Sequence, residues 1–500
     1  MIEDDKQYTE KLIIVSNRLP IVLNKIDDEW HVKPGSGGLV TAMAPVLKNR
    51  GGSWIGWPGA AATEEEIPRE ILDKTGDEAG YYLKGVYLTQ KELDKYYYGF
   101  ANEVLWPLFH DLQSRCNFEP DYWEAYRMVN HRFAEKISEF ASDEDFIWVH
   151  DYHLLLAAEE LRKLGVKSKK AFFLHIPFPP LDIFLKLPWR FEILNAMLQY
   201  DLIGFQTARD RRNFIHCVRR LIEHFRVHGE GQVVGATVEN HEIRIGAFPI
   251  SIDFREFENL AASSQVSDAA WFIHEDLPNR SIMLGVDRLD YTKGIPQRLN
   301  AFRKALEMYP EMREKISLVQ VVVPSRTEVP EYQQLKEHID QLVGEINGQF
   351  TSSGWVPIHY VFRSLDRIEL LAYYRTAEIA LITPLKDGMN LVAKEYCASN
   401  IEENGVLILS EFAGAAAELR EGAVFANPHD IVGTANAIYK AYKMPPEERS
   451  ERMSKMRNAV RRQDIFRWVD SFLKGAFAED LSSFPKIRDY MPDELEEDSK

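Results

Sequence analysis

The sequence predicts an α/β protein built from two Rossmann-like domains that face each other across a cleft. Short β-rich segments alternate with amphipathic helical segments along almost the whole chain, and such alternation forms parallel sheets covered by helices on both faces. The alternation comes in two series, separated by a polar, helix-like segment. The chain has 500 residues, whereas a single domain usually has about 100 to 200, so two large domains are expected.

The strand candidates of the two series fix the expected boundaries. Those of the first series are KLIIVSN, SWIGWPG, FIWVHD, KAFFLHIP, DLIGFQT and IRIGAFPI, and those of the second are RSIMLGV, ISLVQVVV, HYVFRSL, EIALITP and GVLILSE. The segment SIDFREFENLAASSQVSDAA, which begins at residue 251, places the boundary near residue 255. We therefore predict domains over residues 1–255 and 256–465. Residues 466–500 carry most of a helical pattern, DIFRWVDSFLKGAF, which could return to the first domain, and an acidic tail, PDELEEDSK.

Composition excludes several classes of function. Lys and Arg number 60 against 77 Asp and Glu, so the formal charge of −17 argues against nonspecific binding to nucleic acid or to an anionic membrane. An anionic ligand would therefore need a local cluster of basic residues. The start, MIEDDKQYTEKLIIV, fits neither a signal peptide nor a transit peptide, and no apolar run reaches the roughly 18 residues of a membrane helix. The cysteines, Cys116, Cys217 and Cys397, are isolated from one another, which predicts neither disulfides nor a zinc site and favours the cytoplasm.

Polar residues collect just after the strand candidates. In open α/β sheets, ligands bind beyond the carboxyl ends of the strands. The residues at these positions are Asn17 and Arg18 after KLIIVS, His150 and Asp151 after FIWV, His175 after AFFL, Arg288 after MLGVD, Arg326 after VVVPS and Asp387 after LITPLK. We expect the loops that carry them to line the cleft.

The segment GVDRLDYTKGIPQRL, residues 285–299, has the composition of a phosphate site. A strand ends there, Arg288 and Lys293 follow, and Gly294 with Pro296 opens a helix. A helix N-terminus with an Arg and a Lys beside it would hold a diphosphate. The alternative is a solvated basic loop.

The segment LITPLKDGMNLVAKEY, residues 381–396, is a second strand-to-helix corner. Asp387 and Gly388 lie at the corner, the amides of residues 389–392 begin a helix, and Glu395 could accept hydrogen bonds from a pair of sugar hydroxyls. The alternative is structural, because a tight corner favours glycine and the helix dipole favours acids near a helix start. A nucleotide sugar would satisfy both corners at once.

Other chemistries lack their motifs. No GxxxxGK[ST] or GxSxG occurs, and HDYHL, residues 150–154, has two histidines but no third metal ligand in view. The segment GSGGLV, residues 35–40, is either a tight turn or a glycine-rich lip near Arg18. Paired carboxylates for glycoside hydrolysis stay open, because their separation depends on the fold.

Taken together, the motifs resemble the trehalose-6-phosphate synthases of glycosyltransferase family 20. The resemblance covers roughly residues 11–470 and rests on SNRLP, GSGGLV, WIGWPG, YYYGFANEVLWP, WVHDYHLL, FFLHIPFP, GFQT, GVDRLDYTKG, VVVPSR, DGMNLVAKEY and LILSEFAGAA, in this order. It implies a retaining glucosyltransferase of the GT-B type that moves glucose from UDP-glucose to glucose 6-phosphate, without a metal or other cofactor. The products would be α,α-trehalose 6-phosphate and UDP.

The resemblance also implies roles for individual residues. On the donor side, Arg288 and Lys293 would bind the diphosphate, and Glu395 would bind the ribose. Asp387 would bind the glucose hydroxyls, and His175 would touch the sugar near the transferred carbon. The catalytic residues would be Arg288, Lys293, His175 and Asp387. The donor site would also contain Gly38, Gly388, Met389, Asn390, Leu391 and Val392. The acceptor site would contain Arg18, Tyr97, Trp106, Asp151 and Arg326.

Each implied role has a plain alternative. Tyr97 and Trp106 could be core residues of a helix, His175 a satisfied buried histidine, and Asp151 the cap of a helix that begins at Tyr152 or His153. Arg326 follows an apolar strand, where an arginine must find an anion or water. Two rival functions remain, a sister transferase with another phosphorylated acceptor such as glycerol 3-phosphate, and a noncatalytic regulatory homologue. The residues themselves fix neither the donor base, which could be UDP, ADP or GDP, nor the oligomeric state, a homo-oligomer included.

Overall fold

The structure is a computed structural model of the 500-residue chain and describes residues 11–27, 29–35, 38–64, 66–239, 241–326, 329–481, 483–485 and 489–492. Most of the predicted acidic tail and residues 36 and 37 of the glycine-rich segment lie outside these ranges. The chain forms two compact units, which we describe separately. Unit 1 contains residues 1–248 and 468–487, and unit 2 contains residues 249–467 and 488–500.

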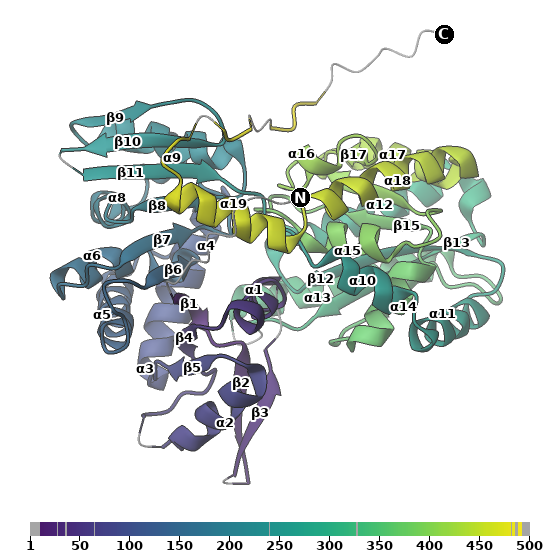
Figure 1. Ribbon diagram of the computed structural model, residues 1–500. Coiled ribbons are helices and arrows are strands. Elements are labelled where there is room, and N and C mark those ends of the chain that lie inside the picture. Colours follow the sequence, from purple (N-terminus) through teal and green to yellow (C-terminus); the bar gives the residue numbers. More distant parts are fainter. Residues whose placement is uncertain are drawn as a thin grey trace, which may run out of the picture. The chain divides into compact units, whose positions relative to one another are not determined.

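Unit 1 is built on a nine-stranded sheet with the order β5-β4-β1-β6-β7-β8-β11-β10-β9 (Figure 1). Its first six strands have the order 3-2-1-4-5-6 of a Rossmann fold, counted along the chain, and all pair in parallel. The strands are β1 (Leu12–Arg18), β4 (Ser53–Trp57), β5 (Tyr82–Gly85), β6 (Phe146–His150), β7 (Lys169–Phe173), β8 (Leu202–Phe205), β9 (Phe225–His228), β10 (Val233–Val238) and β11 (His241–Ala247).

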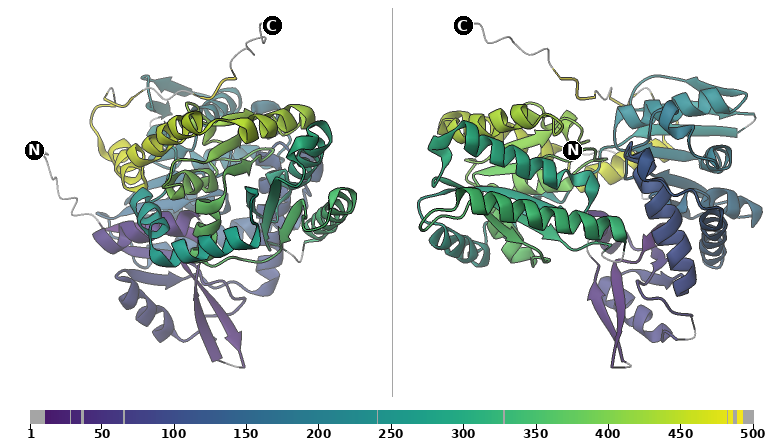
Figure 2. Two further views of the ribbon diagram at one scale, coloured as in Figure 1. Left: turned by 90° about the vertical axis from the view of Figure 1, so that its right-hand side faces the viewer. Right: turned by 180° about the vertical axis from the view of Figure 1, so that it is seen from behind.

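Two features of unit 1 depart from the predicted parallel sheet. Strands β11, β10 and β9 pair antiparallel and extend one edge, where only IRIGAFPI was expected. A separate two-stranded ribbon, β2 (Ile21–Ile26) and β3 (Glu29–Pro34), projects from the unit (Figure 2). Hairpin strands are short and half exposed, so their apolar pattern is weaker than that of a buried parallel strand.

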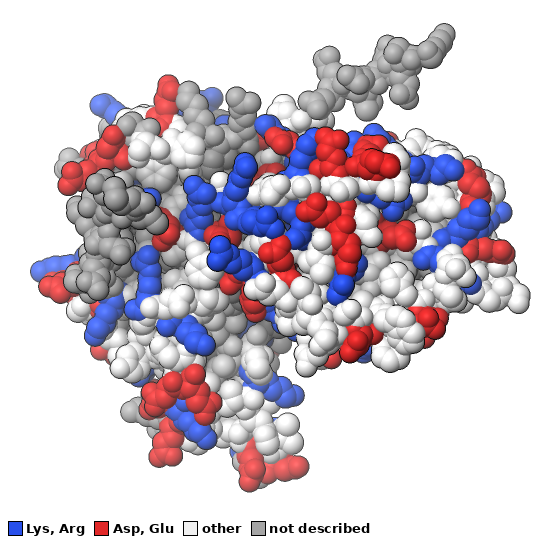
Figure 3. Space-filling model, turned by 45° about the vertical axis from the view of Figure 1, so that its right-hand side comes forward, with Lys and Arg blue, Asp and Glu red and all other residues white. Residues whose placement is uncertain are grey.

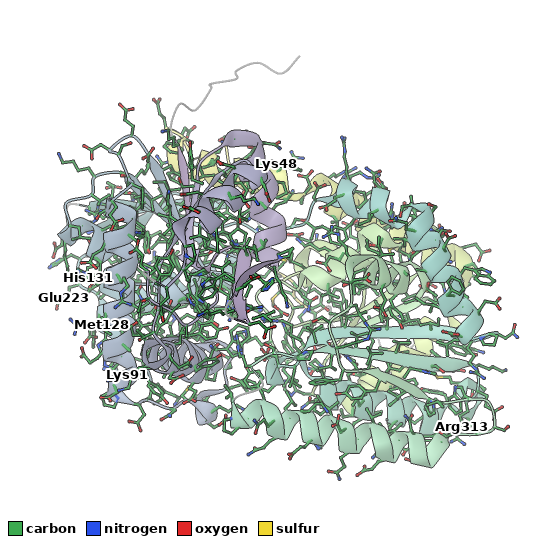
Figure 4. The ribbon with its side chains drawn as sticks, turned by 90° about the horizontal axis from the view of Figure 1, so that it is seen from below. Lys48, Lys91, Met128, His131, Glu223 and Arg313 are labelled. Atoms are coloured by element: carbon green, nitrogen blue, oxygen red, sulfur yellow. The ribbon has the colours of Figure 1, made fainter. Side chains whose placement is uncertain are left out.

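The helices of unit 1 are amphipathic. In α5, Tyr126, Val129 and Phe133 are buried, whereas the labelled Met128 and His131 lie on the outer side (Figure 4). The helices are α1 (Gly38–Arg50), α2 (Arg69–Ala79), α3 (Gln90–Glu92), the π-helix η1 (Leu93–Leu105), α4 (Trp106–Phe109), η2 (Gln113–Arg115), α5 (Pro120–Ser138), η3 (Tyr152–Leu154), α6 (Ala157–Lys163), α7 (Leu181–Phe184), α8 (Arg190–Met197) and α9 (Ala208–Leu221).

The last helix, α19 (Ile465–Phe477), contributes its residues from Trp468 onward to unit 1. The Trp148 ring of β6 stacks on Trp468 and Phe472, with ring centroids 5.0 and 4.1 Å away. Gly204 in β8 leaves the space for this helix, because a Cβ at that position would lie 2.6 Å from the Phe472 ring. The predicted helix is therefore confirmed, and its apolar side is part of the unit 1 core.

Unit 2 contains an all-parallel sheet with the order β14-β13-β12-β15-β16-β17, which again is 3-2-1-4-5-6 along the chain. Every residue of β15 and β16 is buried, as expected for a parallel sheet covered on both faces. The strands are β12 (Ser281–Arg288), β13 (Ile316–Val323), β14 (Ile358–Val361), β15 (Ile379–Ile382), β16 (Val406–Ser410) and β17 (Val424–Ala426).

The helices of unit 2 form two groups. Helix α12 packs against α13 and α17, while α10, α11, α14, α15, α16 and α18 pack among themselves. The bounds are α10 (Phe254–Ala261), α11 (Ser264–Asp276), η4 (Tyr291–Lys293), α12 (Ile295–Met308), η5 (Pro310–Met312), α13 (Pro330–Phe350), α14 (Arg367–Thr376), α15 (Leu391–Ser399), α16 (Ala416–Leu419), α17 (Ile431–Lys443) and α18 (Pro446–Arg462). No helix in the described ranges has the length and apolarity needed to cross a bilayer.

Candidate active site

The predicted diphosphate corner of unit 2 lies after β12. Arg288 is the exposed last residue of that strand, and Asp290 folds the next turn by accepting hydrogen bonds from the Thr292 amide and hydroxyl at 2.9 and 2.8 Å. Gly294 then begins α12 with φ +65°, and a Cβ there would lie 2.6 Å from the Thr383 carbonyl oxygen. The predicted helix start, with Pro296 in its first turn, is confirmed.

Asp290 is a buried carboxylate that three predicted phosphate-binding cations share. Arg326 Nη1 lies 3.5 Å from Asp290 Oδ2, and Arg326 also donates to the Tyr332 hydroxyl. Burial raises the pKa of Asp290, but the charges of Arg326, Lys293 and Arg288 outweigh it and bring the pKa below its usual value. Arg326 therefore meets its anion inside unit 2, which answers the question raised by its position after an apolar strand.

The corner after β15 faces the same region. Lys293 Nζ donates to Asp387 Oδ2 at 2.6 Å, and Asn390 Nδ2 donates to the same oxygen at 3.1 Å. Strands β12 and β15 are neighbours whose connections leave in opposite directions, and ligands of doubly wound sheets bind at such a switch point. Asp387 therefore does more than complement its own helix dipole, because its partner comes from another loop.

The backbone of this corner is held by the loop after β16. The Asp387 amide donates to the Phe412 carbonyl at 3.3 Å, the Gly414 amide to Asp387 at 3.1 Å, and the Ala415 amide to Met389 at 2.8 Å. Asn390 has φ +79° and caps α15 by accepting from the Ala393 amide. The remaining predicted residues of the corner lie at this helix start: Gly388, Leu391 and Val392.

Glu395 lies on α15 and is half buried. The Tyr374 hydroxyl donates to Glu395 Oε2 at 2.9 Å. Burial raises the pKa of Glu395, and the Tyr374 hydrogen bond and the Arg367 charge only partly reverse this. The carboxylate keeps one oxygen for which no hydrogen bond within the described residues is found, so it could accept from a ligand hydroxyl.

Arg298, which was not predicted as a site residue from the sequence, is a buried side chain that contacts both corners. It is 1% exposed, pairs with the buried Asp287, and also donates to Thr383 Oγ1 and to the Lys293 carbonyl at 3.3 and 3.4 Å. It therefore ties the loop that carries Lys293 to the end of β15. An arginine inside a helix gives no sequence signal of burial, which explains why it was missed.

In unit 1, Arg18 lies at the end of β1 among aromatic rings. Its guanidinium lies 4.7 Å from the Trp57 ring and 5.3 Å from the Tyr97 ring, and Tyr97 stacks on His153 at 5.7 Å. Within the described residues, Arg18 has no carboxylate partner. An exposed guanidinium held over rings can bind a phosphate.

Trp106 and Tyr97 belong to one aromatic group despite their separation in sequence. Trp106 is buried and lies 5.8 Å from the Tyr152 ring, and Tyr152 lies 4.0 Å from His153, on which Tyr97 stacks. The burial of Trp106 also fits the alternative of a core residue, while Tyr97 is only half buried. Gly38 begins α1.

The alternative role of Asp151 as a helix cap is wrong. Its side chain makes no capping hydrogen bond to η3, because its own backbone has φ +75° and ψ 166° and turns the carboxylate elsewhere. Asp151 Oδ1 instead accepts from the His175 amide at 3.3 Å. The half-buried His175 ring contacts His150, with Nε2 to Nδ1 at 3.1 Å, and burial lowers the pKa of His175 to about 3.

No group of three or more potential metal ligands occurs among the residues that the structure describes. On the face shown in Figure 3, both acidic and basic side chains are present. The site residues that sequence reasoning missed lie next to predicted ones: Trp57, His153, Asp290 and Arg298. Trp57 and His153 were within quoted motifs, but nothing in a sequence separates an aromatic site residue from an aromatic core residue.

Two α/β units of Rossmann strand order, one with a cation cluster at its switch point, define a nucleotide-binding enzyme class. The sequence model of the protein family described as glycosyltransferase family 20 matches residues 10–477, so the chain belongs to this family of glycosyltransferases. The predicted family and α/β fold class are thereby confirmed.

Similar proteins include the trehalose-6-phosphate synthase of Mycolicibacterium smegmatis, 42% identical over 473 residues that cover 93% of this chain and 92% of the relative. A UDP-forming α,α-trehalose-phosphate synthase from Burkholderia xenovorans, solved in complex with glucose-6-phosphate, has a TM-score of 0.84 at 35% identity, covering 93% of this chain and 99% of that one. A structure from E. coli bound with UDP-2-fluoro glucose has a TM-score of 0.84 at 36% identity and the same coverage.

Proposed function

We propose that the protein is a UDP-forming α,α-trehalose-phosphate synthase, which transfers glucose from UDP-glucose to glucose 6-phosphate and releases UDP. Its similarity to the relatives extends over nearly the whole length of both chains, and two of them were solved with glucose-6-phosphate and with a fluorinated UDP-glucose. The observation that carries the proposal is the contact between Lys293 and Asp387 at 2.6 Å at the switch point of unit 2.

The donor would bind in unit 2. Arg288 and Lys293, beside the N-terminus of α12, would hold the diphosphate, and Glu395 would accept from the ribose hydroxyls. Asp387 would then exchange part of its contact with Lys293 for the glucose hydroxyls, with Gly388, Met389, Asn390, Leu391 and Val392 around it. We assign His175 and Gly38 of unit 1 to the donor as well.

The acceptor would bind through a separate set of residues. Arg18 and Arg326 would bind the phosphate of glucose 6-phosphate, Tyr97 and Trp106 would pack on the sugar, and Asp151 would accept from its hydroxyls. Arg18 supports this assignment best, because its guanidinium is exposed and lies over two rings. Arg326 would have to share its charge between the phosphate and Asp290.

We propose that the reaction retains configuration by front-face substitution. The bond from glucose C1 to the diphosphate oxygen breaks while the acceptor hydroxyl attacks C1 from the same face and passes its proton to that leaving oxygen. Arg288 and Lys293 would stabilise the charge that grows on the diphosphate, which is the kind of interaction that lowers a barrier most. With these cations and the helix amides in place, a divalent metal would not be required.

We also propose that the protein works in the cytoplasm. All three cysteines are free, as is usual for proteins of a reducing compartment. Burial raises the pKa of the Cys217 and Cys397 thiols to about 12, which favours the less reactive thiol form.

One assay tests the proposed reaction. Purified protein is incubated with UDP-, ADP- or GDP-glucose and with glucose 6-phosphate or glycerol 3-phosphate, with and without EDTA, and nucleotide release and product configuration are followed by NMR. We expect activity with UDP-glucose and glucose 6-phosphate, an α,α product and no effect of EDTA. A β-linked product, dependence on a metal, or preference for glycerol 3-phosphate would each overturn the corresponding part.

A further inference from the structure

Two histidines of unit 1 meet at the carboxyl ends of neighbouring strands. His150 ends β6, and it pairs in register with Phe173, the last residue of β7. His175 follows two residues later, and its Nε2 lies 3.1 Å from His150 Nδ1, with the rings 5.3 Å apart. A hydrogen bond therefore joins the two imidazoles.

His150 is more than a packing residue. It is 0% exposed and lies against the Trp148 ring at 4.8 Å, where a Phe or Leu would pack without burying ring nitrogens. Its Nε2 is buried and makes no hydrogen bond with any residue that the structure describes. The only hydrogen bond found for the ring is therefore the one to His175.

The orphaned nitrogen decides which ring donates. If His150 carried its proton on Nε2, a buried N–H would have no acceptor, and orphaned buried N–H groups are rare in proteins. With the proton on Nδ1, the orphan is a lone pair, which is the less costly state. His150 then donates from Nδ1, and His175 Nε2 accepts.

His175 is thereby limited to one neutral form, with its proton on Nδ1. Burial keeps both rings uncharged, since it lowers the pKa of His175 to about 3 and that of His150 well below its usual value. Gln206 Nε2 lies 3.5 Å from His175 Nδ1, and a half-turn of this side-chain amide, which exchanges its nitrogen and oxygen, would bring the oxygen toward that proton. At this distance the hydrogen bond is weak, so the N–H stays available to a substrate oxygen.

The backbone at the same place is also fixed. Asp151 has φ +75° and ψ 166°, a strained region that is essentially restricted to glycine. Its amide donates to the Phe173 carbonyl at 2.8 Å, and its carboxylate accepts from the His175 amide. Strain of this kind persists where the surroundings determine the geometry, as at binding sites.

We propose that His150 is a positioning residue for the glycosyl transfer: its Nδ1–H holds the His175 ring in the Nδ1–H form and aims that N–H at a hydroxyl oxygen of the donor sugar. The role of His175 toward the sugar rests on the proposed function. The placement of the protons on the two rings does not rest on the proposed function. The proton placement and the role of His175 toward the sugar can therefore fail independently.

The proton placement is tested directly by NMR. Protein labelled with 15N-histidine is studied by long-range 1H–15N correlation at neutral pH, and the signals of the two rings among the 14 histidines are assigned from His150→Asn and His175→Asn. We expect wild-type His175 as the neutral Nδ1–H tautomer. An Nε2–H tautomer or a charged ring at His175 overturns the proposal, whatever the activity.

Kinetics test the consequence. His150→Leu removes the donor and keeps the bulk, while His150→Asn keeps an N–H near the Nδ1 position. We expect His150→Leu to lower kcat by about tenfold to a hundredfold, the range for residues that orient a ligand through a second hydrogen bond, with the KM for glucose 6-phosphate within about twofold. His150→Asn should recover most of kcat.

Trp148→Phe is the matched control, because it loosens packing on the same ring without touching the hydrogen bond, and it should retain near wild-type kcat. If His150→Leu is fully active, or if Leu and Asn are equally impaired, the positioning role is wrong. If His150→Leu does not fold, the wild-type tautomer and His150→Asn still decide. If the tautomer is as expected but His175→Asn keeps full kcat, the proposed role of His175 fails and the pairing stands.

Discussion

Units 1 and 2 place their candidate residues at the same point of the same strand order, yet with different side chains. In unit 2 the loops beside the switch point between β12 and β15 carry cations and carboxylates that already interact: Lys293 pairs with Asp387, Arg326 pairs with Asp290, and the charge of Arg288 also acts on Asp290. In unit 1 the switch point between β1 and β6 carries one exposed guanidinium over aromatic rings, and two histidines that burial keeps neutral.

This difference separates two ways of binding a phosphate. In unit 2 a ligand phosphate must compete with carboxylates for its cations, so the network sets the position of each charge before the ligand arrives. In unit 1 the rings hold Arg18 without neutralising it. We therefore expect substitutions in unit 2 to disturb stability and turnover, and substitutions in unit 1 to act mainly on the affinity for the acceptor.

The largest effect should come from the buried pair beneath the unit 2 site. Arg298→Leu would leave Asp287 buried and without its partner, which should lower the free energy of unfolding of unit 2 by about 3–5 kcal/mol. Urea unfolding followed by circular dichroism measures this loss. Asp287→Leu in the same chain should restore part of it.

Arg127→Leu in unit 1 is the matched comparison. Its guanidinium lies 3.3 Å from Glu124, the two side chains are 56% and 69% exposed, and pairs of this kind contribute about 1 kcal/mol or less. If both variants lost the same free energy of unfolding, burial would not explain a difference between the two ion pairs.

The next largest effect should be on turnover. Lys293→Ala removes a cation from the diphosphate and also removes the lysine contact of Asp387, so kcat should fall by about a hundredfold or more. In Arg288→Ala the decrease in kcat should be smaller, because Arg288 is exposed at the strand end. Steady-state kinetics at saturating UDP-glucose and glucose 6-phosphate measure both.

Arg303→Ala controls for loss of charge alone, since Arg303 lies in the same unit, pairs with Glu345 at 2.8 Å and should be neutral within about twofold. Near wild-type kcat in Lys293→Ala would remove the basis for a charge-stabilised leaving group.

The contrast between the units also explains what the sequence could predict. Every strand candidate became a strand, because buried parallel strands are continuous apolar runs, and the charged residues at their ends, such as Arg288 and Asp387, could be recognised against that background. The β2–β3 ribbon and the antiparallel edge were not predicted, since half-exposed strands lack such runs. In unit 2 the sequence therefore indicated most of the candidate site.

The aromatic side of unit 1 was less predictable. Trp106 is buried and Trp57 is 3% exposed, so the site and the core use the same residue types at the same depth. The pairing of His150 with His175, and of Asp151 with the His175 amide, depends on the register of β6 and β7, which the sequence does not encode locally. Charge marks a site in sequence, whereas aromatic packing marks it only in three dimensions.

A smaller effect is expected from Arg18. Arg18→Ala should raise the KM for glucose 6-phosphate by about tenfold or more, because a hydrogen bond to a charged group contributes roughly 1.5–3 kcal/mol, while kcat changes little. Trp57→Leu removes one of the rings that hold the guanidinium, so its effect should be weaker, corresponding to about 0.5–1 kcal/mol. An unchanged acceptor KM in Arg18→Ala would mean that the acceptor phosphate binds elsewhere.

The smallest effect should come from the hydroxyl that holds Glu395. Tyr374→Phe removes the 2.9 Å hydrogen bond to Glu395 Oε2, so the KM for UDP-glucose at neutral pH should rise by about threefold, as for a typical single hydrogen bond. The same hydrogen bond lowers the pKa of Glu395 against the effect of burial, so its loss raises that pKa further.

Donor binding should depend on the protonation state of Glu395. Only the ionised carboxylate accepts from both ribose hydroxyls, so the affinity for UDP-glucose should fall as the pH drops through the pKa of Glu395, and in Tyr374→Phe this fall should begin at a higher pH than in the wild type. Tyr373→Phe, on the same helix, should leave the profile in place, and Glu395→Gln should abolish it. A profile that does not move in Tyr374→Phe would mean that another group controls donor binding in acid, and Glu395 would then lose its assignment to the ribose.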